Sequence, residues 1–198
     1  MKKNGYLGVS KNITSDLALF ASKLTYKKIP QEAISFTKIL ILDALACALA
    51  GDNGEETAKI RALAHSLALS KESSVIGGKK LSVAGSVLMN SYLITAVTMC
   101  DTHRETLTHI MPEVLPAALA IAELNGNNGT ELITAVTIGC EIACRIGVGI
   151  DYPAFRERGW HGPGVIGPFG AAAAVGHLCK FNKERMTHAF GLAGSQAA

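Results

Sequence analysis

The chain has 198 residues, of which 48% are hydrophobic and 18% are charged, and its formal net charge is +3 at pH 7. Because this charge is small and no stretch of Lys and Arg is interleaved with aromatic residues, we expect no nucleic-acid partner. The low share of charged residues predicts that apolar surface meets a partner, which points to an oligomer or to a missing domain.

The cysteines and the longest apolar run bound the cellular context. No signal peptide is recognisable, so the five cysteines are expected to be reduced core residues of a cytoplasmic protein. Cys140 and Cys144 are four positions apart, but no histidine or second cysteine pair near them completes a zinc pattern. The longest apolar run, residues 39–50, is too short to cross a bilayer and contains Asp43, so we expect no membrane segment.

Apolar residues recur at helical spacing in every long segment, which predicts an all-α fold with at least six helices. Thr14 or Ser15 caps the first predicted helix, which ends near Tyr26. Further helices are expected over residues 31–50, 55–68, 82–100, 113–125, 130–149 and 183–192, with Thr130 and Asn182 as N-caps. Residues 31–50 are apolar around most of the helix circumference, which predicts a helix in the interior. Residues 75–76 form the strand candidate, so at most a minor strand pair is expected.

The stretch DTHRETLTH, residues 101–109, gathers polar and ionisable groups directly after a predicted apolar helix. Asp101 could orient a histidine or a substrate hydroxyl, and Thr102 could donate a hydrogen bond to a carboxylate. His103 or His109 could carry a proton near neutral pH, although for either histidine taken alone a hydrogen-bonded structural role is the favoured interpretation. No two of these residues have the helical spacing that makes a zinc motif specific, so we expect no metal here.

A second stretch, RGWHGPGVIGPFGAAAAVG over residues 158–176, joins one titratable imidazole, His161, to a run of small residues. Its glycines and prolines predict a tightly turned loop, with a helix from Gly170 onward. The N-terminus of such a helix suits an anionic ligand near His161. The alternative is a glycine-rich connection to a closely packed core helix, with His161 inert.

The chain resembles the MmgE/PrpD family over residues 12–198. The resemblance rests on these two stretches and on four further segments, LILDALACALAG, SVIGG, PEVLPAALAIAE and HAFGLAGSQAA. Members include 2-methylcitrate dehydratase, cis-aconitate decarboxylase and iminodisuccinate epimerase. The resemblance implies a mostly helical domain that forms a homodimer and shares its active site with a second, α/β lid domain. It also implies small polycarboxylate substrates and no metal or organic cofactor.

The family pattern places active-site residues on Asp101, Thr102, His109 and His161 of this chain. We expect the two histidines to act as acid/base groups or carboxylate contacts, with Asp101 positioning and Thr102 donating. His103, together with Gly162 and Gly164, is expected on the substrate-binding side. The implied activity is that of a lyase or isomerase, 2-methylcitrate dehydratase-like, which moves a proton next to a carboxylate.

The chain departs from the family pattern in two places and in length. The family usually has a second acid and an aromatic residue before D-T-H, where this chain has Met99 and Cys100, and Ile110 follows His109 where proline is common. Family members are more than twice as long, and their catalytic lysines would follow Ala198. Residues 1–198 are therefore expected to be a truncated N-terminal helical domain that is inactive alone. The alternative is a non-catalytic helical remnant or dimerisation subunit.

Overall fold

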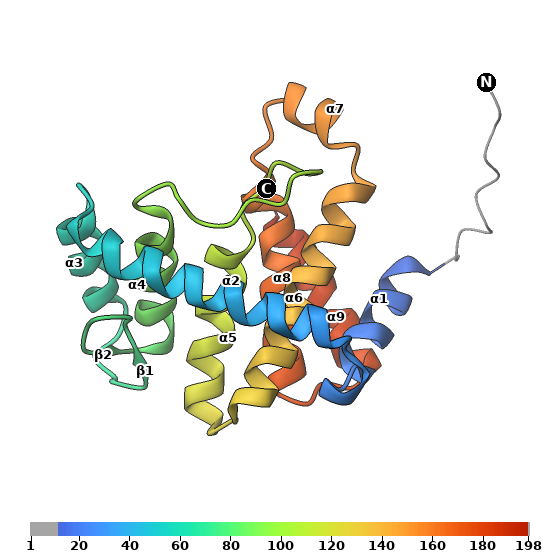
Figure 1. The fold of residues 1–198 in the computed structure, drawn as a ribbon, viewed down its shortest axis with the longest axis horizontal. Coiled ribbons are helices and arrows are strands. Elements are labelled where there is room, and N and C mark those ends of the chain that lie inside the picture. The colour runs from blue at the N-terminus through green and yellow to red at the C-terminus, as the bar shows by residue number, and fades with distance from the viewer. Residues whose placement is uncertain (1–11, 198) are drawn as a thin grey trace.

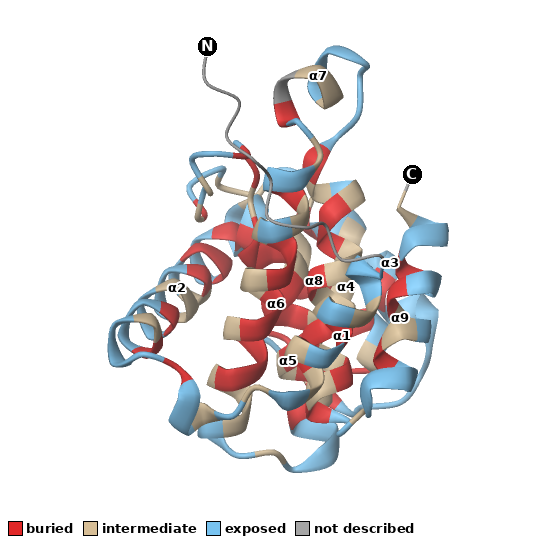
Figure 2. Ribbon diagram, turned by 90° about the vertical axis from the view of Figure 1, so that its right-hand side faces the viewer, coloured by how far each residue is buried: buried red, intermediate tan, exposed pale blue. Residues whose placement is uncertain are grey.

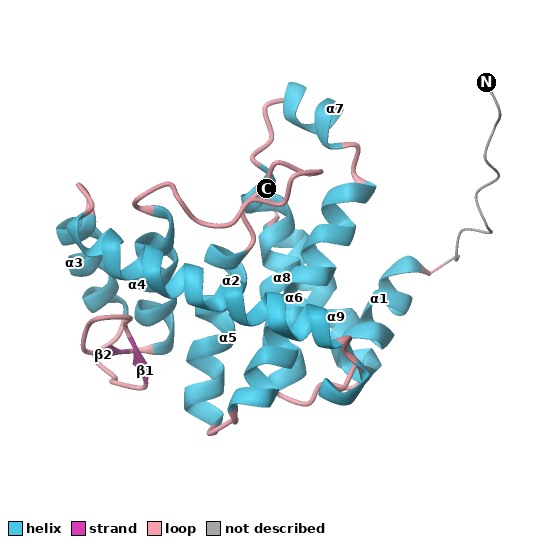
Figure 3. Ribbon diagram, viewed as in Figure 1, coloured by secondary structure: helices cyan, strands magenta, loops and turns pink. Residues whose placement is uncertain are grey.

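The structure is a computed structural model in which residues 12–197 are described, so residues 1–11 and 198 of the expected domain lie outside the described residues. Within this range the chain forms nine α-helices, two short 3-10 helices and one antiparallel pair of two-residue strands (Figure 3). The all-α prediction is confirmed. The elements are α1 (Ile13–Lys23), η1 (Tyr26–Lys28), α2 (Gln31–Ala50), η2 (Gly51–Asn53), α3 (Thr57–Leu67), β1 (Ser73–Ser74), β2 (Lys80–Leu81), α4 (Val83–Thr95), α5 (Met111–Asn125), α6 (Gly129–Gly149), α7 (Tyr152–Glu157), α8 (Gly162–Leu178) and α9 (Lys183–Gln196).

Helix α8 lies at the centre of the C-terminal half, where it packs against α5, α6 and α9 (Figure 1). Glycines allow α6 and α8 to approach closely, because a Cβ at Gly139 would lie 2.8 Å from the Gly170 carbonyl oxygen. Most fully buried side chains come from α4, α5, α6 and α8. Helices α1 and α9 add a smaller cluster around Met186 and Phe190. The small side chains of α8 thus set the spacing of the core.

Helix α8 begins at Gly162, eight residues before the predicted start at Gly170. Pro163 sits in the first turn, where a missing N–H costs nothing, and the ring fixes a helical φ. Pro168 lies inside the helix and is tolerated there. The predicted loop is therefore mostly helix, and His161 is the N-cap residue of α8.

Helix α2 crosses the face of the bundle and buries only one side, which packs against α4, α5 and α6 (Figures 1 and 2). Its other side exposes apolar side chains, among them Phe36 at 60% and Leu42 at 67% of full exposure, and also Asp43. The prediction of an interior helix is wrong in the described chain. A helix that is apolar on all sides can be buried on any of them, but the neighbouring helices decide which side is covered.

Two described helices, α2 with its 3-10 extension to Asn53 and α6, are long and apolar enough to cross a membrane by length and composition. Both pack against other helices of the bundle in the structure. A core helix of a water-soluble protein passes the same test. Length and composition are therefore the same for a membrane-spanning helix and for a core helix of this kind.

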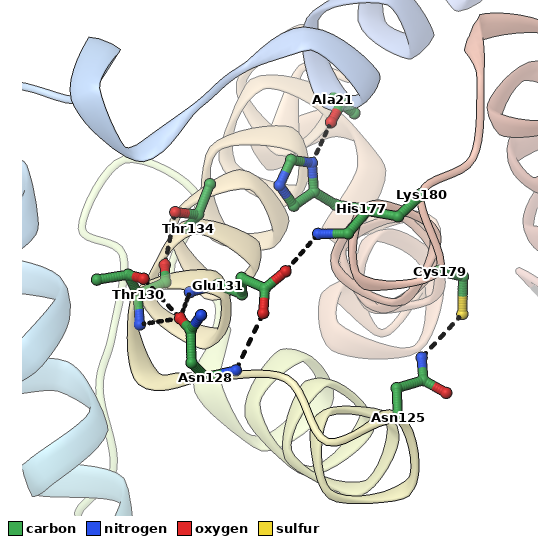
Figure 4. A network of polar contacts seen from close by, with 9 residues as sticks. All are labelled: Ala21, Asn125, Asn128, Thr130, Glu131, Thr134, His177, Cys179 and Lys180. Atoms are coloured by element: carbon green, nitrogen blue, oxygen red, sulfur yellow. Dashed lines mark hydrogen bonds and ion pairs between the residues drawn. The ribbon is translucent and has the colours of Figure 1, made fainter.

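Two helix starts are capped by a residue other than the predicted one. Asn12 accepts a hydrogen bond from the Ser15 N–H ahead of α1, and Asn128 caps α6 in a capping box with Glu131 (Figure 4). The predicted cap at Asn182 is confirmed. The strand pair consists of Ser73–Ser74 and Lys80–Leu81, whereas the predicted residues 75–76 lie in the turn between them.

Candidate active site

The loop between α4 and α5, residues 96–110, carries four of the predicted site residues. Helix α4 ends at Thr95, five residues earlier than predicted, and the chain takes left-handed conformations at Thr98 (φ 55°) and Leu107 (φ 47°). The His103 N–H donates to the Thr108 carbonyl at 2.9 Å, which closes residues 103–108 into a tight turn. This turn brings Asp101 and His109 together at its base.

Asp101 caps helix α5 with its side chain. One carboxylate oxygen accepts the Met111 N–H at 3.0 Å and the other accepts the Ile110 N–H at 3.1 Å. Burial raises the pKa of this carboxyl, and the two backbone donors oppose that shift. The carboxylate therefore satisfies donors at a helix start that would otherwise lack partners.

His109 is held by the main chain of Asp101 and not by its carboxylate. The Nδ1 atom lies 2.7 Å from the Asp101 carbonyl oxygen, 3.4 Å from Thr102 Oγ1 and 3.6 Å from Cys100 Sγ. Because a carbonyl oxygen only accepts, Nδ1 must carry the hydrogen of this contact. In the neutral ring, Nε2 is then the unprotonated nitrogen, which is available for acid/base chemistry.

The remaining predicted residues of the loop differ in their contacts. Thr102 is exposed, and its hydroxyl is the atom near His109 Nδ1. The His103 Nδ1 lies 2.9 Å from Thr106 Oγ1, so within the described chain this ring serves the turn itself. His103 therefore combines a structural hydrogen bond with a half-buried position beside the predicted site.

His161 stands at the start of α8, directly beside this loop. A Cβ at Gly162 would lie 2.7 Å from Thr108 Oγ1 and 2.8 Å from the Tyr152 ring, so the backbone of α8 touches the residue before His109. The His161 ring is exposed, and none of the hydrogen bonds found among the described residues involves it. Gly164, in the same first turn, is also exposed, whereas Gly162 is buried by these contacts.

A cavity of about 490 Å³ lies between the loop and α7. Its lining residues are Arg104, Glu105, Leu107, Tyr152, Arg156 and Glu157. A further cavity of about 660 Å³ lies between α1 and the C-terminal end of α6. Neither cavity is lined by His109 or His161, so the prediction that these histidines share one cavity with Asp101 and Thr102 stays a prediction.

Comparison with known proteins decides the family of the chain. The family model for the MmgE/PrpD N-terminal domain matches residues 15–198. The chain belongs to the MmgE/PrpD family. This confirms the resemblance seen in the sequence motifs.

Curated relatives of this MmgE/PrpD chain carry one activity in their names. The chain is 31% identical to a cis-aconitate decarboxylase of Aspergillus terreus, over 99% of this chain and 41% of the relative. It is 27% identical to the cis-aconitate decarboxylase-like protein oryM of Aspergillus oryzae, over 94% of this chain and 40% of the relative. The human cis-aconitate decarboxylase is 25% identical, over 94% of this chain and 40% of the relative. The chain thus spans about two fifths of the length of the relatives it matches.

One ionisable residue beside the site of this MmgE/PrpD domain was missed by sequence reasoning. Glu113 lies in the first turn of α5 and packs against α8, where a Cβ at Gly167 would be 2.4 Å from its Cγ atom. Burial raises the pKa of this carboxyl to about 8, and the charge of Asp101 adds to the shift. The available signal was an isolated acid between Pro112 and Pro116 in an apolar stretch.

Among the described residues of the domain, no three His, Cys, Asp or Glu side chains come close enough to hold a metal ion. The cysteines are free: Cys47 and Cys100 are buried, Cys140 and Cys144 are half-buried, and Cys179 is exposed. Burial raises the pKa of Cys100 to about 12 and that of Cys144 to about 11. The thiols of Cys100 and Cys144 are therefore protonated and weakly nucleophilic at neutral pH.

Proposed function

We propose that this chain is the substrate-binding helical part of a cofactor-independent lyase or isomerase of the MmgE/PrpD type. Its substrate is a small di- or tricarboxylic acid, and its chemistry is proton transfer at carbon next to a carboxylate. The family match over residues 15–198 and the names of the curated relatives support this proposal. This chain spans 41% of the length of the Aspergillus terreus relative, so the activity of a whole enzyme is part of the proposal.

The observation that carries the proposal is the contact between Thr108 and Gly162. It joins the loop that carries His109 to the helix that His161 caps, although these histidines are far apart in sequence. His109 has Nδ1 committed to the Asp101 carbonyl, which leaves Nε2 for a substrate. Two imidazoles on adjoining elements suit a reaction that holds a carboxylate and moves a proton.

Among the possible reactions we place decarboxylation first, because the relatives are named cis-aconitate decarboxylases. In that reaction the bond between carbon and the leaving carboxylate breaks, carbon dioxide departs, and the electron pair left on carbon accepts a proton. A histidine imidazolium supplies the proton and becomes neutral. Thr102 donates a hydrogen bond to a carboxylate that stays on the substrate. Dehydration of a 2-methylcitrate-like hydroxy acid is the second candidate. In that reaction a neutral histidine takes the proton from the carbon next to a carboxylate, a carbon–carbon double bond forms, and the hydroxyl group accepts a proton and leaves as water.

We also propose that the working form is a homodimer, for which the exposed apolar side of α2 is the supporting observation. Phe36, Ile39, Leu42 and Leu49 are each more than half exposed in the described chain. Apolar patches of this kind mark protein contact sites in water-soluble proteins. The competing reading, a non-catalytic helical remnant, would keep such a surface but would have no reason to bind a carboxylic acid.

A titration of the histidine rings tests the proposed site without requiring turnover. The chain is labelled in its imidazole rings and titrated with cis-aconitate and, separately, with 2-methylcitrate, while NMR follows all histidine signals. We expect His109 and His161 to shift together with one dissociation constant, and the exposed His65 and His188 to stay unchanged. Replacement of His161 by glutamine should abolish the shift of His109, whereas His188→Gln should not. If His109 and His161 respond at different ligand concentrations, or if neither responds, the proposed site is wrong.

A further inference from the structure

Glu113 is a half-buried acid with one buried carboxyl oxygen, and the proposed chemistry does not use it. It lies at the third position of α5, and its aliphatic stem fills the space left by the missing side chain of Gly167. Its Oε2 atom is buried and has no hydrogen-bond partner among the described residues. A buried carboxyl oxygen without a partner is costly when the group is ionised, so the neutral acid is the favoured form here.

Glu113 shares its surroundings with Asp101, which caps the same helix. The Asp101 oxygens accept two backbone N–H groups, whereas Glu113 has one buried oxygen without a donor. Donors that point at a carboxylate stabilise its charge, and a nearby like charge opposes ionisation. A single proton on this pair therefore resides on Glu113, while Asp101 keeps the negative charge.

The charges around the pair come from three elements. The titratable groups whose charges bear on Asp101 or on its cysteine neighbours are Asp43 and Cys47 of α2, Cys100 and His109 of the loop, and Cys140, Glu141 and Cys144 of α6. Of these, His109 is the basic one, and it favours the ionised form of Asp101. Helix α8 meets Glu113 at Gly167, and residues 162–171 around that glycine contain no titratable side chain. A second negative charge on Glu113 would therefore find no nearby lysine or arginine in this set.

We propose that Glu113 is a positioning residue of the site, whose protonated carboxyl keeps Asp101 the single negative charge at the start of α5. When Glu113 loses its proton, the first turn of α5, whose start Asp101 caps, gains a second negative charge. The Asp101 carboxylate then takes up a proton more readily, and its hold on the Ile110 and Met111 N–H groups weakens. The same added charge disfavours a carboxylate ligand beside His109. That last consequence rests on the proposed function, whereas the charge coupling between the two acids does not.

The test follows the backbone amides of Ile110 and Met111, because these protons report directly on the Asp101 carboxylate. Their NMR shifts are recorded between pH 6 and pH 10 in the wild-type chain and in two neutral variants, Glu113→Gln and Glu113→Met. We expect a titration step near pH 8 in the wild type and in neither variant. The control variant Glu55→Gln removes one exposed acid elsewhere and should keep the step. The second neutral variant guards against a local change peculiar to glutamine.

A step that persists in both neutral variants, or a wild type without any step, would overturn the inference. Binding of cis-aconitate provides the second readout. We expect the affinity to fall about tenfold more between pH 7 and pH 9 in the wild type than in Glu113→Gln, which corresponds to a coupling of about one pKa unit. Equal pH dependence in both proteins would overturn the ligand part. If cis-aconitate fails to bind while the amide step is present, the charge coupling stands and the proposed function fails.

Discussion

Replacement of Gly170 by alanine is expected to destabilise the fold because α8 has no room for another carbon at this point. A Cβ placed there would lie 2.9 Å from the Gly139 carbonyl oxygen, 2.9 Å from Val114 Cγ2 and 3.1 Å from Ala143 Cβ. Ordinary contacts between such atoms are about 3.5 Å or longer. Three neighbours from α5 and α6 would have to yield at once, and one of them is backbone.

The size of the effect follows from two opposing contributions. An added methyl group in a well-packed core costs about 1–3 kcal/mol, and a contact with backbone belongs at the upper end. Alanine favours the helix over glycine by about 0.5–1 kcal/mol. The net loss for Gly170→Ala is therefore about 2 kcal/mol. Gly191 of α9 provides the matched control, since nothing lies within 4 Å of a Cβ there. Gly191→Ala should raise the free energy of unfolding by about 0.5–1 kcal/mol.

Urea unfolding followed by circular dichroism measures both variants against the wild type, with the denaturant slope as a check that all three unfold alike. In thermal unfolding, the expected fall in Tm for Gly170→Ala in a domain of this length is about 4–8 °C. Equal stability of Gly170→Ala and Gly191→Ala would refute this prediction, because helix propensity alone would then explain both.

Three further predictions concern charge and capping. Because burial raises the pKa of Glu113 from 4.5 to about 8, the folded chain holds this proton more tightly than the unfolded chain. The free energy of unfolding should therefore fall as pH rises from about 4.5 to 8, by at most about 5 kcal/mol, and Glu113→Gln should flatten this slope in urea titrations at several pH values. Burial lowers the pKa of His177, whose Nδ1 lies 3.0 Å from the Ala21 carbonyl oxygen, so its contribution is present above pH 6.5 and is lost as pH falls through the lowered folded pKa (Figure 4). His177→Gln should remove that acid-side loss, and an unchanged slope below pH 6.5 would contradict the assignment. Asn128→Ala breaks the capping box with Glu131 and should cost about 1 kcal/mol of thermal or urea stability, whereas a change below 0.3 kcal/mol would show that α6 needs no cap.

The helices could be predicted because each carries its own periodic apolar pattern, as α6 does between Gly129 and Gly149. The first and last residues of the helices were harder to predict, since they depend on which neighbour forms hydrogen bonds with the free backbone groups at the helix ends. The Asp101 carboxylate starts α5 at Met111, two residues before the predicted position. Such a capping bond between residues ten positions apart has no local sequence signal.

The candidate site shows the same division. The residue types that point to acid/base chemistry were visible in the sequence, and the family motifs placed them. The partner of His109 was not predictable, because it is a backbone carbonyl whose position depends on the turn at residues 103–108. Glu113 escaped notice because its burial comes from α8, through the absent side chain of Gly167.

The side chain and the main chain of Asp101 have different structural roles. Its side chain holds the start of α5, and its main-chain carbonyl holds the ring of His109. Ordinary mutagenesis changes only the first of these, so a substitution scan would report position 101 as a folding residue. The link to the imidazole would remain invisible to such a scan. A backbone ester at the peptide bond after Asp101, introduced by chemical ligation, would weaken the carbonyl as an acceptor and expose that hidden role.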